Sequence, residues 1–65
     1  MTIEVYNDQK MVIGFVVAKN VLSGMDTVRK AFPNVGSVNT QGSLPSSDKR
    51  LTKIADNIYS WDLTA

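Results

Sequence analysis

The run from Met11 to Ala18 (MVIGFVVA) constrains the fold most strongly, because it is apolar on both faces when it is extended. Alternation gives two sets of side chains: Met11, Ile13, Phe15 and Val17 on one face, and Val12, Val16 and Ala18 on the other. A strand of this kind needs cover on both sides, whereas a single helix covers only one. Gly14 between them marks a candidate bulge or bend.

Two arrangements would cover the second face of this strand. The fold curls and covers it internally, which we slightly favour, or the face contacts a partner protein or a second copy of the chain. On the second alternative, the candidate contact residues are Val12, Phe15 and Val16.

The chain has 65 residues and contains neither cysteine nor histidine. We treat residues 1–65 as a single small domain, and a domain of this size is only marginally stable. Disulfides and the usual zinc, copper and haem ligands are absent, so the stability has to come from a packed core or from association with another chain.

The first half of the chain has the patterns of a hairpin followed by a helix. Residues Thr2–Tyr6 alternate like a half-buried strand, and Asn7–Lys10 has the composition of a turn. Residues Asn20–Phe32 predict a helix that starts at a cap on Asn20 or Ser23 and stops before Pro33. Its expected apolar stripe consists of Val21, Leu22, Met25, Val28 and Phe32.

The second half is less regular. Residues Val35–Thr40 form a weak strand candidate, and Gln41–Lys49 has the composition of a loop. Residues Arg50–Leu63 fit either a helix or a hairpin about an Asp56–Asn57 turn, and we choose the hairpin because Ile, Tyr, Trp and Thr favour strands. A regular hairpin predicts three cross-strand pairs: Ile54 with Tyr59, Thr52 with Trp61, and Arg50 with Leu63.

These elements predict an α+β fold, a small antiparallel sheet in the order β-β-α-β-β-β with one helix packed on one face. The net charge is +1, which gives no long-range field for nucleic acid or an anionic membrane. No apolar run approaches the roughly 20 residues that span a bilayer, and no secretory signal is visible. We therefore expect a cytoplasmic protein that does not bind membranes.

The sequence shows no catalytic, cofactor or metal motif. The chain has no histidine to serve as a base, and the serines Ser46 and Ser47 lie near Lys49 and Lys53 in a polar segment that would not activate a lysine. The segment 36–43 (GSVNTQGS) lacks the spacing and the lysine of a phosphate-binding loop. The acidic residues are scattered. We expect a protein that is not an enzyme and that needs no cofactor or metal.

One group of residues resembles a binding site in composition. It combines cations with aromatic residues near the C-terminus and consists of Lys49, Arg50, Lys53, Tyr59 and Trp61. Such a combination binds single-stranded nucleic acid through phosphate contacts and base stacking. The single tryptophan of a small domain more often lies in the core, which is the interpretation we favour for Trp61.

Three functions follow from these observations. The first is a small protein-binding module (an inhibitor, adaptor or regulator) that acts by surface contact, with a phage or mobile-element origin as a hypothesis from size alone. The second is a single-stranded nucleic-acid-binding domain that uses the C-terminal hairpin. The third is a homo-oligomeric structural protein that pairs through the Met11–Ala18 strand.

Overall fold

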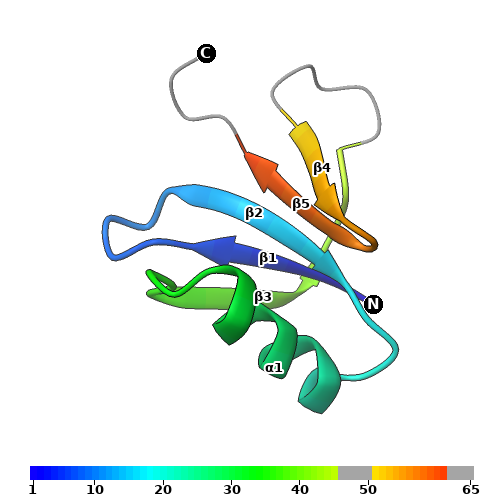
Figure 1. The fold of residues 1–65 in the computed structure, drawn as a ribbon. Helices are drawn as coiled ribbons and strands as arrows, with labels where there is room; N and C mark the ends of the chain where they lie inside the picture. Colours follow the sequence, from blue (N-terminus) through cyan, green and yellow to red (C-terminus); the bar gives the residue numbers. More distant parts are fainter. Residues whose placement is uncertain (46–50, 62–65) are drawn as a thin grey trace.

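The computed structural model describes residues 1–45 and 51–61. Within them, the elements are β1 (Thr2–Tyr6), β2 (Val12–Val17), α1 (Val21–Ala31), β3 (Ser37–Gly42), β4 (Leu51–Ala55) and β5 (Ile58–Trp61). The strands form one antiparallel sheet in the order β3-β1-β2-β5-β4, and α1 lies against one face of it (Figure 1). The predicted α+β fold and its order of elements are confirmed.

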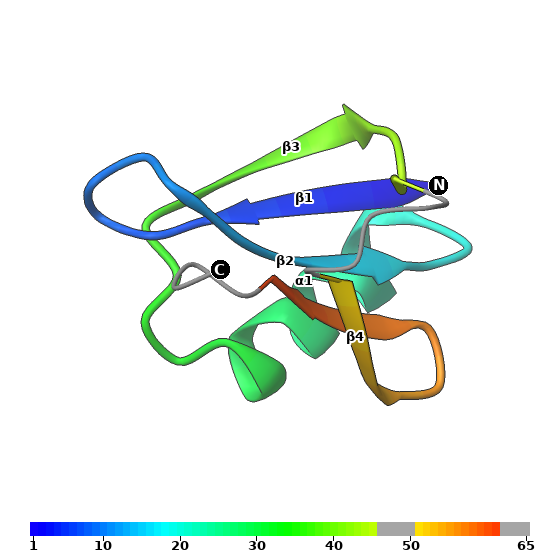
Figure 2. The same cartoon turned by 90° about the horizontal axis from the view of Figure 1, so that it is seen from above.

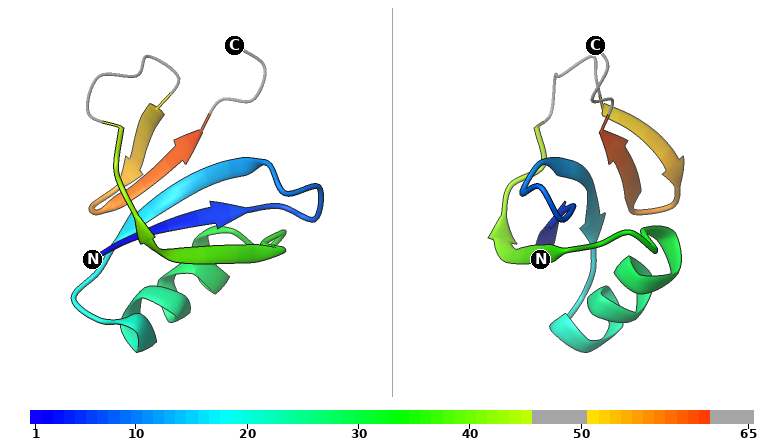
Figure 3. Two further views of the ribbon diagram at one scale, coloured as in Figure 1. Left: turned by 180° about the vertical axis from the view of Figure 1, so that it is seen from behind. Right: turned by 90° about the vertical axis from the view of Figure 1, so that its left-hand side faces the viewer.

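The sheet is strongly twisted, so the β4–β5 hairpin stands at a steep angle to β1 and β3 (Figures 1 and 3). Strands β3 and β4 are its two edges, on opposite sides of the molecule when it is seen from above (Figure 2). The chain after β3, residues 43–45, leaves the sheet on the side away from α1 (Figure 3). Across the described ranges, no helix has the length and apolar character needed to cross a membrane.

The turn between β1 and β2 forms as its composition predicts. The Asn7 side chain accepts hydrogen bonds from the backbone N–H groups of Gln9 (2.9 Å) and Met11 (3.0 Å). Lys10 takes a positive φ of 63° in this turn. A short polar side chain that bonds to its own following backbone stabilises such a turn locally.

The core lies between α1 and the sheet. Its buried members come from β1, β2, α1 and the residue that follows the helix, and they are Ile3, Val5, Val16, Val28 and Phe32. Half-buried side chains pack around them, including Ile58 from β5 and Val38 from β3. All strands except β4 therefore contribute to the layer beneath the helix.

The helix begins at the predicted cap, and the expected stripe is buried in part: Val28 and Phe32 are buried, whereas Val21 and Leu22 are exposed. The Asn20 side chain accepts a hydrogen bond from the Ser23 backbone N–H (2.9 Å), as an N-cap does. Leu22 is 86% exposed, while Gly24 and Val28 are buried. A side chain at Gly24 would overlap Ile3, so the missing side chain lets the helix approach β1 closely. The prediction that Leu22 belongs to the buried stripe is wrong. It considered apolar side chains alone, and therefore did not place Gly24 on the buried face, where the helix comes close to β1.

Strand β2 has an irregularity next to Gly14. Val5 pairs with Gly14, but the next pair joins Tyr6 to Val12, which leaves Ile13 as an extra residue. Ile13 packs against the core beneath the helix rather than sharing a face with Phe15. The predicted bulge is present at this point of the strand, and the simple alternation of odd and even positions holds only from Gly14 to Val17.

The C-terminal segment is a hairpin, as chosen, with Ala55 paired with Ile58 across Asp56 and Asn57. Asn57 takes a positive φ of 63°, which asparagine tolerates well. Two of the predicted cross-strand pairs, Ile54 with Tyr59 and Thr52 with Trp61, are wrong: Lys53 pairs with Tyr59, Thr52 with Ser60 and Leu51 with Trp61.

The cause of this difference is a bulge at Ile54, since the register shifts between Lys53 and Ala55. Ile54 is 54% exposed at the bulge. One extra residue in one strand moves every later side chain of that strand to the opposite face. The predicted pair of Arg50 with Leu63 lies outside the described residues.

We expect Gly14→Ala to destabilise the fold strongly. A methyl group at this position would overlap both the Phe32 ring and the backbone carbonyl oxygen of Tyr59. Overpacking of this kind lowers the free energy of unfolding by roughly 1–3 kcal/mol. Urea denaturation measures the loss, and the Phe32→Leu background should reduce it because the ring is shortened. An unchanged midpoint for Gly14→Ala would contradict the close packing.

A second pair of substitutions checks which face of the helix is buried. Val28→Ala removes two buried methyl groups and should lower the free energy of unfolding by roughly 2 kcal/mol. Leu22→Ala should change it by less than about 0.5 kcal/mol, because the side chain is exposed. Thermal or urea denaturation of both variants measures the difference. Equal losses would show that the helix packs through Leu22 after all.

Candidate functional site

The sheet face opposite α1 gathers most of the aromatic side chains of the chain. We call it the aromatic face, and its central residues are Glu4 and Tyr6 of β1, Phe15 of β2, Tyr59 and Trp61 of β5, and Leu51 and Lys53 of β4. The register places them together, because Glu4 pairs with Phe15, Phe15 with Tyr59, and Tyr59 with Lys53. Of the two phenylalanines, two tyrosines and one tryptophan of the chain, only Phe32 lies beneath the helix.

Phe15 is the centre of this face and is only 3% exposed. Its ring meets the ring of Trp61 edge to face, with centroids 5.8 Å apart and planes at 68°. This geometry is favourable for aromatic pairs and contributes about 0.5–1.5 kcal/mol beyond the buried area. Tyr59 and Trp61 themselves are half-buried. Trp61 therefore packs within the molecule and still presents part of its surface.

Of the five residues in the predicted cationic and aromatic group, the structure places Lys53, Tyr59 and Trp61 on one face of the sheet. The bulge at Ile54 turns Lys53 toward the face that carries Tyr59 and Trp61, whereas a regular hairpin would have placed it on the other side. The ammonium group of Lys53 lies 3.6 Å from the carboxylate of Asp56, an exposed contact of small energetic value. The other two predicted members, Lys49 and Arg50, lie outside the described residues.

Two of the three residues of the second predicted surface (Val12, Val16 and Phe15) are buried. Val16 is 1% exposed beneath the helix, and Phe15 is buried on the opposite face. Val12 is half-buried at the start of the strand. Both edges of β2 are hydrogen-bonded, to β1 and to β5. The favoured alternative, in which the fold covers this strand internally, is confirmed for these two side chains.

A polar network on the same face was not expected from the sequence. The Tyr6 hydroxyl donates to Glu4 Oε1 (3.1 Å), and the Asn39 side-chain amide donates to the same oxygen (2.8 Å). The hydrogen bond to Glu4, followed by burial and by the negative charge of Glu4, raises the pKa of Tyr6 above its ordinary value of 10.0. The spacing of Glu4 and Tyr6 in an alternating strand is the signal that could have predicted their contact.

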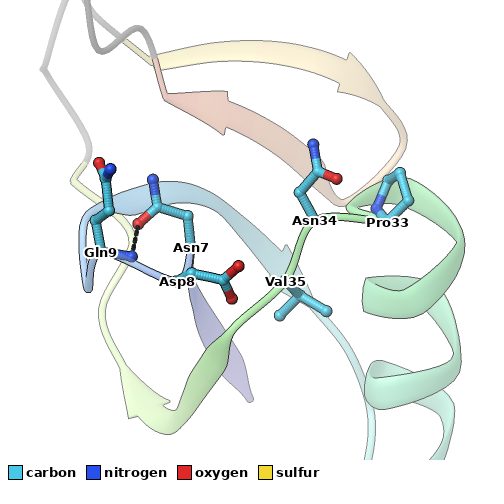
Figure 4. A pocket seen from close by; sticks show the side chains of 6 residues that line it. All are labelled: Asn7, Asp8, Gln9, Pro33, Asn34 and Val35. Carbon is cyan, nitrogen blue, oxygen red and sulfur yellow. Dashed lines mark hydrogen bonds between the residues drawn. The ribbon is translucent and has the colours of Figure 1, made fainter.

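A hollow of about 450 Å³ lies elsewhere, between the β1–β2 turn and the chain that follows α1 (Figure 4). It is lined by Asn7, Asp8, Gln9, Pro33, Asn34 and Val35. The Asn7 amide oxygen is already used by the turn, and Asp8 is the single charged group. These residues offer hydrogen bonds but no pair of groups for acid–base or nucleophilic chemistry.

Known proteins add nothing to this description, because no protein-family model, no curated protein and no solved structure matches the chain. In the part of the chain that the structure describes, no three acidic residues gather where they could hold a metal ion. The aromatic face is therefore the candidate functional site on geometry alone.

We expect Glu4→Gln to lower the pKa of Tyr6 toward its ordinary value. The substitution replaces a charged acceptor by a neutral one, which weakens the hydrogen bond to the Tyr6 hydroxyl and removes the negative charge, and both of these favour the protonated phenol. An NMR titration of the tyrosine ring signals between pH 8 and about 12 measures the change. Asp8→Asn removes the same charge from the exposed turn and should leave the titration of Tyr6 unchanged. A pKa that stays raised in Glu4→Gln would show that Glu4 is not the cause.

Proposed function

We propose that this chain is a small non-enzymatic protein-binding module, an inhibitor, adaptor or regulator that contacts its partner through the aromatic face. The observation that supports the proposal is the concentration of Tyr6, Phe15, Tyr59 and Trp61 on the one sheet face that α1 does not cover. Tyrosine and tryptophan are enriched where proteins bind one another, because they bury a large area and lose few rotamers.

The half-burial of Tyr59 and Trp61 fits this role. The Trp61 ring packs against Phe15, and Tyr59 pairs with Phe15 across the two strands, so the Trp61 ring in particular is ordered before a partner arrives. A surface that is ordered in advance loses less conformational entropy on binding. Leu51 beside Trp61 extends the apolar area toward the edge strand β4.

A single-stranded nucleic acid is the second candidate, since the bulge at Ile54 places Lys53 beside Tyr59. Against it, Glu4 puts a carboxylate on the same face, and Lys53 lies beside Asp56. The net charge of +1 adds no general attraction for phosphates. The charge distribution therefore favours a protein partner.

Affinity capture with matched variants tests the proposal. The tagged chain and the variant Leu22→Ala should retain the same stoichiometric partner from a lysate of the source cells, because Leu22 lies on the helix, away from the aromatic face. Tyr59→Thr removes a central ring while keeping a residue that favours strands, and should reduce recovery at least tenfold.

Circular dichroism of each variant verifies that it is folded before capture. Equal recovery by Tyr59→Thr, or no partner from any variant, would count against the proposal. Binding of a labelled single-stranded DNA that weakens steeply with salt would support the nucleic-acid alternative instead.

A further inference from the structure

Strand β3 is one of the two edges of the sheet, and it carries no charged residue. Its sequence is SVNTQG, and within the described residues β1 is the only strand that pairs with it (Figure 2). An edge strand presents a row of backbone N–H and C=O groups along its free side, and these groups can pair with a strand of another molecule. Lysine and proline commonly prevent such pairing, and β3 contains neither.

The other edge, β4, has two features that protect it. Lys53 places a positive charge on this strand, and the bulge at Ile54 interrupts its regular pairing. Both features disfavour the addition of a further strand, because a new strand would have to bury the charge and match an irregular edge. The edge at β3 has no charge that could act in the same way.

The Asn39 side chain takes up one of the backbone donors of β3. Its Oδ1 atom accepts a hydrogen bond from the backbone N–H of Gln41 (3.0 Å), and its amide group donates to Glu4 Oε1 (2.8 Å). A backbone N–H that is bonded to a side chain of its own strand is not available to a neighbouring strand. The second hydrogen bond, to Glu4 of β1, holds the Asn39 side chain in this position.

An irregularity of the strand begins at the same residue. Glu4 pairs with Asn39 and Thr2 pairs with Gly42, so β3 has one residue more than β1 between these two pairs. An extra residue bends a strand and disrupts its ladder locally. Gly42 contributes to this arrangement, because a side chain at its position would overlap the Glu4 side chain that Asn39 binds.

We propose that Asn39 closes the β3 edge, and that the strand it excludes is β3 of a second copy of the chain. Two copies of β3 can pair antiparallel about a twofold axis, because the same residues then contribute from both sides. Like charges directly opposite each other destabilise such a pair, and β3 brings none. Two β4 strands would instead bring two Lys53 side chains together. This closure is independent of any partner that the aromatic face binds.

Sedimentation equilibrium of matched variants tests this assignment. Asn39→Val removes both hydrogen bonds and favours a regular strand, and should dimerise at a concentration at least about tenfold lower than the unchanged chain does. Ser37→Val adds the same side chain two residues away on the same face of β3 while Asn39 stays in place, and should behave like the unchanged chain. Gln41→Lys in the Asn39→Val background adds a charge to the edge and should restore the monomer.

Amide hydrogen exchange locates the contact, and circular dichroism verifies that each variant is folded. The amides of β3 in Asn39→Val should become more protected as the concentration rises, whereas those of β4 should not. If Asn39→Val does not fold, Asn39→Ala, which removes the same hydrogen bonds without adding a branched apolar side chain, takes its place with the same expectations. A folded variant that stays as monomeric as the unchanged chain, an equal gain by Ser37→Val, dimers that protect β4, or an unchanged chain that already pairs through β3 would overturn the inference.

Discussion

The burial of β2 on both faces is the constraint on which the rest of the structure depends. Val16 packs beneath α1, Phe15 packs on the opposite side, and both edges of the strand are hydrogen-bonded. A chain of 65 residues without disulfides has few ways to surround a strand completely. Here the helix covers one side and the C-terminal hairpin brings Trp61 against the other. The aromatic face is therefore a consequence of this need for cover.

Two of the three register shifts in the sheet decide which side chains of β2, β4 and β5 meet on each face. The extra residue at Ile13 turns that side chain toward the core, and the extra residue at Ile54 turns Lys53 toward Tyr59. Since strand side chains alternate, a shift of one residue exchanges the two faces. The composition of the aromatic face thus depends on two local irregularities as much as on the overall fold.

Local features of the fold could be predicted from the sequence, and long-range registers could not. The helix end before Pro33, the cap at Asn20 and the Asp56–Asn57 turn each depend on neighbouring residues. The bulge at Ile54 depends on packing between β4 and β5, which no local pattern encodes. Gly24 shows the same limit, because its contribution is the close approach of the helix to Ile3. The sequence predicted part of the candidate site, since Tyr59, Trp61 and Lys53 lie on one face as expected. It did not predict that Glu4 and Tyr6 lie on the same face and form a hydrogen bond.

If the aromatic face binds a partner as we propose, the same residues serve stability and recognition, and this limits how specific the face can be. Trp61 holds Phe15 in place, so it cannot be changed to suit a partner without loss of folding free energy. On the proposed function, the apolar centre would supply contact area, and discrimination between partners would have to come from polar groups such as Glu4 and Lys53, which the core does not use. A partner that covers the half-buried rings would also stabilise the fold by mass action, because it binds the folded chain alone.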